Sequence, residues 1–306
     1  MHFKRIIEKT WLATFIVVSL VFVVSYFRDD ADKLARVFDA DLRVLGWAVI
    51  AQFAYFLATV FTWQKTLLYT SGRSVALRES LAQILMVNFG KYIPGKVWGM
   101  AARGKRLVDA GYTVEEITRA SYLEQILLLL TGFALALLSA ALSFGSPLYW
   151  LGFALAAVAV FFLRHDDKLV SLFAKIVPKA ANLLQFFQVR ISTLDTLKLS
   201  VGFSLEWLFL AAAFTFVCAS IVNVELTLMN AAVFVLALTS GFLAGFLAIF
   251  APGGVGVREG VGAVLLTSIV TLEEAVLLML LFRVWVVAAE LLAGAVVLVR
   301  RGNASE

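Results

Sequence analysis

Two stretches of this 306-residue chain place polar residues inside otherwise apolar sequence. The first, residues 88–106, reads NFGKYIPGKVWGMAARGKR and sets five basic residues around a Pro-Gly pair. The second, residues 251–260, reads APGGVGVREG and sets Arg258 and Glu259 just after another Pro-Gly pair. A helix broken at such a pair exposes backbone groups, which a membrane tolerates only where protein or a water-filled cavity covers them. Cations beside the break are therefore candidate ligands for an anion such as phosphate.

The candidate substrate-binding residues are the polar and aromatic side chains of these stretches and one arginine of the last apolar run: Asn88, Lys91, Lys96, Trp98, Arg103, Arg258, Glu259 and Arg283. The candidate helix-break residues are Pro94, Gly95, Pro252, Gly253, Gly254 and Gly256. Arginine can hold a phosphate through two parallel hydrogen bonds, which favours Arg258 as the first cation of the site. For Glu259 three roles stay open: counter-ion, proton carrier or helix cap. For residues 88–106 the alternative is a cytoplasmic loop whose lysines face lipid headgroups.

Three carboxylates, Glu124, Glu206 and Glu290, lie within apolar runs. Each ionisable residue inside a membrane costs at least about 2.5 kcal/mol, so it is expected to face a cavity or a partner. Arg283 and Glu290 are seven residues apart, so both are expected on one helical face that points into the bundle. One interpretation is a polar translocation path with ion or proton coupling. The other is a set of structural ion pairs, such as Glu124 or Glu206 with Arg103 or Arg283.

The composition identifies an integral membrane protein. The chain is 62% hydrophobic and 15% charged, against about 25% charged in soluble domains. One cysteine and two histidines favour neither an internal disulfide nor a metal centre. The basic residues lie between hydrophobic spans, which argues against nucleic-acid binding. The sequence presents no nucleophile-base set, so we expect no catalytic residue, no cofactor and no metal.

Apolar runs near 20 residues predict an all-α polytopic bundle with about six complete spans. These are residues 11–27, 42–63, 117–144, 148–163, 199–222 and 275–299. Residues 80–110 and 229–270 are the two broken segments, each expected to form a re-entrant hairpin. Residues 229–250 are also long enough to cross the bilayer completely. The run at 11–27 has no small-residue cleavage site after it, so we expect an uncleaved span.

The positive charge predicts the orientation. With the N-terminus inside, most of the 26 Lys and Arg residues fall on the cytoplasmic side, as the positive-inside rule expects. Both termini are then cytoplasmic. We expect one membrane domain over residues 1–306, with repeat halves at about 42–164 and 199–300. The polar segment 165–198 between them is expected to lie on the inner membrane surface, since residues 169–176 have an amphipathic pattern.

The two broken segments form an internal repeat. Displaced by 158 residues, positions 94–116 and 252–274 align without a gap and share eight identities, including Pro-Gly and Thr-x-Glu-Glu. Roughly one or two identities are expected by chance at average residue frequencies. Three complete spans, at 117–144, 148–163 and 199–222, separate the two hairpins, so the first hairpin opens to the cytoplasm and the second to the outside. The sequence thus predicts an inverted repeat around a midplane site, as in many transporters.

The motifs also resemble a known family. Asn88-x-x-Lys91-Tyr-Ile-Pro-Gly-Lys-Val-Trp98 with Arg103, and Pro252-Gly-Gly-Val-Gly-Val-Arg-Glu259, are similar to those of the lysylphosphatidylglycerol synthase transmembrane-region family, also called flippase-like. The resemblance implies a module that moves aminoacylated phosphatidylglycerol between leaflets, or a role in polyprenyl-linked glycan pathways. The sequence ends at Glu306, soon after the last span, so we expect no aminoacyl-transfer domain and no synthase activity.

Three functions compete at this point. The favoured one is a flippase for an anionic phosphate lipid, aminoacylated or polyprenyl-linked, in the cytoplasmic membrane. The second is a non-transporting subunit that serves a glycosyltransferase or a lipid-modifying enzyme. The third is a membrane-embedded transferase acting on a lipid-linked substrate. The sequence does not predict the oligomeric state, the direction of movement or its energy source.

Overall fold

A computed structural model describes residues 39–91, 98–144, 191–248 and 251–302, and these are helical without a strand. Five of the helices are long and apolar enough to cross a membrane: α3 (Leu42–Ser71), α6 (Val114–Phe144), α10 (Thr193–Ile221), α11 (Leu228–Leu247) and α13 (Leu272–Gly302). The expected polytopic helix bundle is confirmed. The expected spans at 11–27 and 148–163, and the surface helix at 169–176, lie outside the described residues.

Capping side chains mark where two of the spans, α10 and α3, begin. Helix α10 starts at Thr193, six residues before the predicted position, because the Ser192 hydroxyl accepts a 3.0 Å hydrogen bond from the Asp195 amide. Helix α3 starts where the Asp41 carboxylate accepts a 2.8 Å hydrogen bond from the Arg43 amide. It ends at Gly72, whose left-handed backbone (φ 72°) suits glycine.

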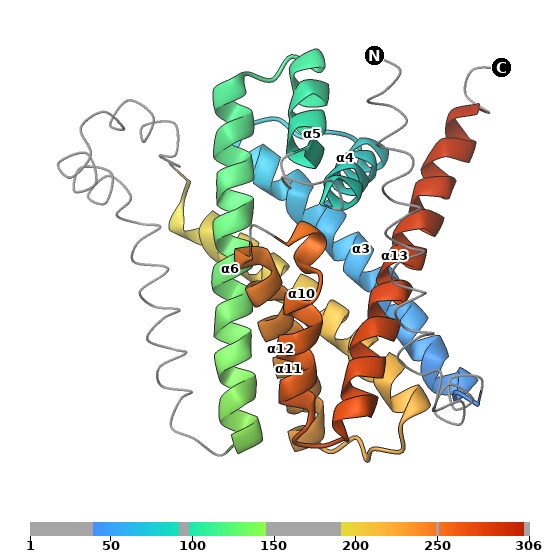
Figure 1. The fold of residues 1–306 in the computed structure, drawn as a ribbon. Coiled ribbons are helices and arrows are strands. Elements are labelled where there is room, and N and C mark those ends of the chain that lie inside the picture. Colours follow the sequence, from blue (N-terminus) through green and yellow to red (C-terminus); the bar gives the residue numbers. More distant parts are fainter. Residues whose placement is uncertain (1–38, 92–97, 145–190, 249–250, 303–306) are drawn as a thin grey trace.

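The two predicted broken segments are both interrupted helices. The first comprises α4 (Leu77–Gly90) and α5 (Trp98–Asp109); the second comprises α11, the short 3₁₀ turn η3 (Pro252–Gly254) and α12 (Val257–Leu266). In Figure 1 the α4–α5 pair opens towards the end of the bundle where α6 begins, and the α11–α12 pair opens towards the end where α13 begins. The pairs differ in one respect, since α11 has 20 residues and can span the membrane, whereas α4 has 14.

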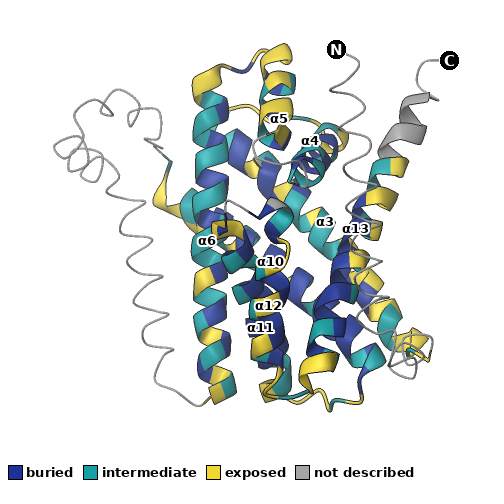
Figure 2. Cartoon of the chain, in the orientation of Figure 1, coloured by how far each residue is buried: buried dark blue, intermediate teal, exposed yellow. Residues whose placement is uncertain are grey.

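The core lies where α10 packs against α3, α11 and α13 (Figure 2). Phe214 of α10 is its centre, with ring centroids 4.9 Å from Phe282 and 6.1 Å from Phe234. In contrast, α3 leaves large apolar side chains such as Trp47 and Phe53 more than half exposed. Such side chains are compatible with lipid, so the exposed apolar face of α3 is the face expected to contact the bilayer.

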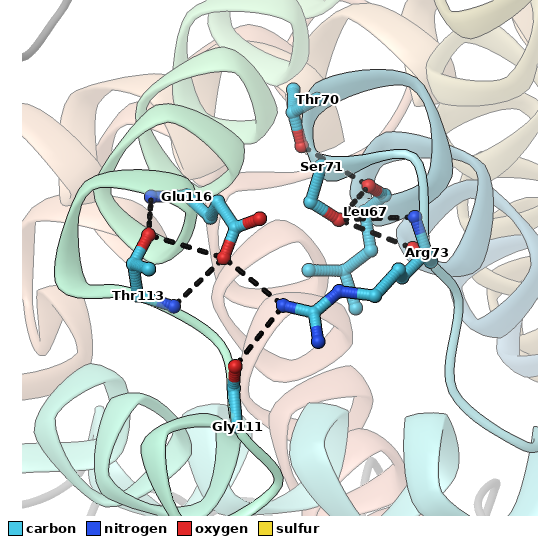
Figure 3. A network of polar contacts seen from close by, with 7 residues as sticks. All are labelled: Leu67, Thr70, Ser71, Arg73, Gly111, Thr113 and Glu116. Carbon is cyan, nitrogen blue, oxygen red and sulfur yellow. Dashed lines mark hydrogen bonds and ion pairs between the residues drawn. The ribbon is translucent and has the colours of Figure 1, made fainter.

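A polar network joins the end of α3 to the turn between α5 and α6 (Figure 3). The Glu116 carboxylate accepts hydrogen bonds from the Thr113 amide (2.7 Å) and the Thr113 hydroxyl (3.1 Å), which caps α6. Arg73, just after α3, donates to the same carboxylate at 3.1 Å and to the Gly111 carbonyl at 3.1 Å. This network sets where α6 starts relative to the end of α3.

Candidate functional site

Glycine lets the arms of each interrupted helix approach closely. A side chain at Gly90 of α4 would overlap the backbone of Gly99 in α5. In the second pair, a side chain at Gly241 of α11 would overlap the Arg258 carbonyl, and one at Gly254 would overlap Gly245. Nothing larger than a hydrogen atom fits at these positions, so the two arms of each pair pack closely. The breaks thereby bring backbone and charged side chains to the middle of the bundle.

Arg103 of α5 is held by α6. Its guanidinium donates to both carboxylate oxygens of Glu124, at 2.9 and 2.5 Å, and to the Ser121 hydroxyl at 3.2 Å. It also stacks on the Trp63 ring, with 3.7 Å from the guanidinium carbon to the ring centroid. Arg103 is 1% exposed, so the structure places this predicted substrate cation in a buried ion pair, one of the pairings that the sequence left open.

Glu259 of α12 has a partner for each carboxylate oxygen. One oxygen accepts a 2.7 Å hydrogen bond from the Gly256 amide and so caps α12, while the other accepts from Arg283 of α13. Arg283 also reaches the Gly253 carbonyl at 3.4 Å. Of the roles open for Glu259, this geometry corresponds to helix cap and counter-ion together. Its cation partner on the following span is Arg283.

A third ion pair joins the two halves of the chain. The Lys91 ammonium, just after α4, lies 2.5 Å from the Glu290 carboxylate of α13. The Glu290 side chain is 3% exposed and that of Lys91 is 31% exposed. As expected, Arg283 and Glu290 both point into the bundle. Glu290 thus reaches across to the first interrupted helix.

Three cations converge on one cleft of about 120 Å³. Lys91, Arg258 and Arg283 line it together with Phe242, Gly245, Phe246, Gly253 and Val286, and we call this the basic cleft. Arg258 is 8% exposed, and its guanidinium carbon lies 3.2 Å from the centroid of the Phe242 ring, a cation–π contact. The cleft lies beside the first turn of α12, whose N-terminal dipole favours a bound anion.

A second cleft of about 120 Å³ shares Phe242 with the basic cleft. We call it the acidic cleft. Its polar lining is supplied by Glu124, Glu206, Gln125, Asn88, Tyr55 and Thr59. Here the Asn88 amide nitrogen and one carboxylate oxygen of Glu206 are buried without a hydrogen-bond partner in the structure. Phe242 of α11 lines both clefts, so one aromatic ring contributes to a cationic site and to a carboxylate site.

An apolar groove of about 720 Å³ runs between α3, α4 and α13. Apart from Gln52, Arg78 and Trp285, its described lining consists of aliphatic and phenylalanine side chains. The Trp285 indole donates to the Gln52 amide oxygen at 3.1 Å, while the Gln52 amide nitrogen is buried without a partner in the structure. The groove is lined as an acyl chain would require, with a polar group along its length.

The structure therefore gathers most, but not all, of the predicted site residues. Asn88, Glu124 and Glu206 meet in the acidic cleft and Lys91, Arg258 and Arg283 in the basic cleft, with Glu259 and Glu290 as ion-pair partners. Trp98 is 44% exposed at the start of α5, and Pro94, Gly95 and Lys96 lie outside the described residues. Sequence reasoning missed Phe242, Tyr55 and Gln52, whose types are ordinary for a span; only the fold brings them to the clefts and the groove.

Sequence reasoning also missed one further ion pair, which lies within the first hairpin. Arg106 of α5 donates two hydrogen bonds to the Glu79 carboxylate of α4, the second at 2.5 Å. These bonds raise the pKa of Arg106 above its already high ordinary value. The pair joins the start of α4 to the end of α5, near the open end of the first hairpin.

Comparison with known proteins agrees with this arrangement. No curated protein matches the chain. A family model described as the lysylphosphatidylglycerol synthase TM region matches residues 10–294, nearly the whole length. The match confirms the resemblance carried by the two Pro-Gly motifs, and the chain belongs to this family of multi-pass membrane proteins.

Proposed function

We propose that this protein moves an anionic phosphate lipid between the two leaflets of the cytoplasmic membrane without changing it chemically. The family and the fold fit a membrane lipid-related role. The observation that carries the finer proposal is the basic cleft, where three cations from both halves of the chain meet at the break of the second interrupted helix. Its ligand is the lipid phosphate.

The basic cleft has features that suit a phosphate and that a purely structural cluster of ions would not need. Arg258 places its guanidinium over the Phe242 ring, a contact that helps to orient its donor atoms before a ligand arrives. Lys91 and Arg283 already hold the carboxylates Glu290 and Glu259. A phosphate can exchange with these carboxylates as a competing anion, which allows it to bind and to leave again.

The apolar groove supplies the second part of the proposal. A transported lipid carries acyl or prenyl chains that must stay in an apolar environment while the headgroup crosses the bundle. The groove between α3, α4 and α13 has that character, and α13 lines both sites, with Trp285 in the groove and Arg283 in the basic cleft. We place the chains in the groove and the phosphate in the cleft. The repeat and the opposed hairpins support two gates around this site.

The direct test is reconstitution of the purified protein into liposomes that contain a labelled anionic lipid. We expect the label to move between leaflets with its mass unchanged. A new covalent product would instead favour a transferase. Lipid binding without movement, under any ion gradient, would favour a non-transporting subunit that serves a lipid-modifying enzyme or a glycosyltransferase.

Arg258 provides the test at residue level. In Arg258→Lys the charge remains but the two-pronged hydrogen bonding is lost, and losing one charge-assisted hydrogen bond costs about 1.5–3 kcal/mol. We therefore expect transport to fall roughly 10- to 150-fold with little change in melting temperature. Arg43→Lys, at an exposed arginine beside the start of α3, is the matched control and should transport normally. An Arg258→Ala protein that is stable and transports at the wild-type rate would remove this residue from the site.

A further inference from the structure

Glu206 differs from the other buried carboxylates of the described residues. Glu124, Glu259 and Glu290 each contact a cation: Arg103, Arg283 and Lys91 respectively. Glu206, in the middle of α10, is 5% exposed and has no ion-pair partner within the part of the chain that the structure describes. One of its carboxylate oxygens also lacks any hydrogen-bond partner there. A charge in this position is not compensated, which an interior tolerates poorly.

The groups around Glu206 come from every helix that lines the acidic cleft. Helix α3 contributes Tyr55, and the hydroxyls of Thr59 and Thr62 lie beside the carboxyl group. From α6 comes Glu124, whose negative charge acts on Glu206 but whose own partner is Arg103. Helix α4 contributes the neutral Asn88 and α11 the apolar Phe242. Since the charge of Glu124 that acts on Glu206 is negative, a second negative charge at Glu206 is opposed and binding of a proton is favoured.

The acidic cleft also provides a route for a proton. Its volume of about 120 Å³ has room for water molecules, each of which needs polar partners. Two partners are already present, because the Glu206 oxygen lacks a donor and the Asn88 amide nitrogen lacks an acceptor. Tyr55 extends the polar path, since Glu206, Lys91 and Glu290 all lie close enough for their charges to act on its hydroxyl. The path therefore leads towards the Lys91–Glu290 pair and the basic cleft.

We propose that Glu206 is a proton-binding site and the residue through which a proton gradient acts on transport. Its carboxylate takes one proton from water in the acidic cleft, becomes a neutral carboxylic acid, and returns the proton to water when the cleft opens to the other side. An anion in the basic cleft and a proton at Glu206 then lie in two clefts that share Phe242, and they offset each other's charge. The coupling rests on the proposed function, but the binding of the proton does not.

The proton site is tested by infrared difference spectroscopy of the protein in liposomes while the pH is changed. A protonated carboxylic acid has a carbonyl stretch that a carboxylate lacks, so we expect one such band to appear as the pH falls. The band should be lost in Glu206→Gln, shifted in Glu206→Asp and unchanged in Glu225→Gln, a control at an exposed glutamate between α10 and α11. Melting temperatures establish that each variant is folded.

Persistence of the band in Glu206→Gln, or the absence of any titrating band in the wild-type protein, would overturn the proposal. A band that is suppressed by adding sodium at constant pH would also overturn it and identify a metal-cation site instead. Lipid transport under an imposed pH gradient tests the coupling, and Glu206→Gln should reduce the rate to that measured without a gradient. If the wild-type protein moves no lipid yet shows the band, the flippase proposal fails while the proton site stands.

Discussion

The buried pair of Arg103 and Glu124 gives a sharp test of how the first hairpin is held. In Glu124→Gln the side chain keeps its shape but loses its charge, and Arg103 then stays in place with its positive charge uncompensated. The structure leaves this arginine no access to solvent, because it is 1% exposed and lies between α6 and the Trp63 ring. The Ser121 hydroxyl is its other hydrogen-bond partner, but it is neutral.

The magnitude follows from the burial of both partners. Removing one member of a buried ion pair costs about 3–5 kcal/mol, since an unpaired charge remains in the interior. That is a large share of the roughly 5–15 kcal/mol of a typical folded protein. Replacing both partners, as in Arg103→Met with Glu124→Leu, removes the unpaired charge and should restore most of the loss, apart from the stacking on Trp63.

The assay is equilibrium unfolding of the purified variants in mixed micelles. Lys105→Ala is the control, because Lys105 forms an exposed ion pair with Asp109 at 2.7 Å on the same helix. Such a pair contributes at most about 1 kcal/mol, and often nothing measurable. If Glu124→Gln unfolds like the control, or if the double variant is no better than the single one, the Arg103–Glu124 pair does not hold the hairpin.

Two further predictions concern the second hairpin and the topology. Gly254→Ala should lose about 2–5 kcal/mol of folding free energy, because φ is +72° and the new methyl group would meet the Gly245 backbone; Gly111→Ala, at φ +84° with open space around it, should lose only about 1–2 kcal/mol in the same unfolding assay. With Cys218 replaced, an impermeant thiol reagent on intact cells should label a cysteine at Glu273 but not one at Glu115, and labelling of both from one side would disprove opposed hairpins.

The spans and breaks could be predicted because they depend on local sequence. An apolar run of about 20 residues has few alternatives to a membrane helix, and a Pro-Gly pair within such a run interrupts it. The burial of Glu124, Glu206 and Glu290 was predictable for the same reason, since a charge within an apolar run must avoid lipid. Interruption of the helix at Pro252-Gly253 is confirmed by the turn η3 between α11 and α12.

The choice of partners could not be predicted, because it depends on how helices pack. Lys91 and Glu290 are 199 residues apart, and only the approach of α4 to α13 brings them together. Spans that are apolar all round carry no pattern that tells the lipid-facing side from the core. On α3, for example, Trp47 is 59% exposed whereas Trp63 is 1% exposed, although both are tryptophans of the same helix.

The ion pairs connect the proposed repeat to the two clefts. Each hairpin's second arm is joined to the following span by one arginine–glutamate pair: Arg103 on α5 with Glu124 on α6, and Glu259 on α12 with Arg283 on α13. The residue types are exchanged between the two pairs. Both following spans also begin with the same cap, Thr113 with Glu116 and Thr271 with Glu274.

We infer from this exchange that the halves have kept one architecture while their charges diverged. The pair of the first half leaves Glu124 on the wall of the acidic cleft, and the pair of the second half leaves Arg283 on the wall of the basic cleft. Exchanging arginine and glutamate between the two pairs in this way keeps the buried charge balanced within each half. It also leaves carboxylates in one of the clefts that Phe242 lines and cations in the other.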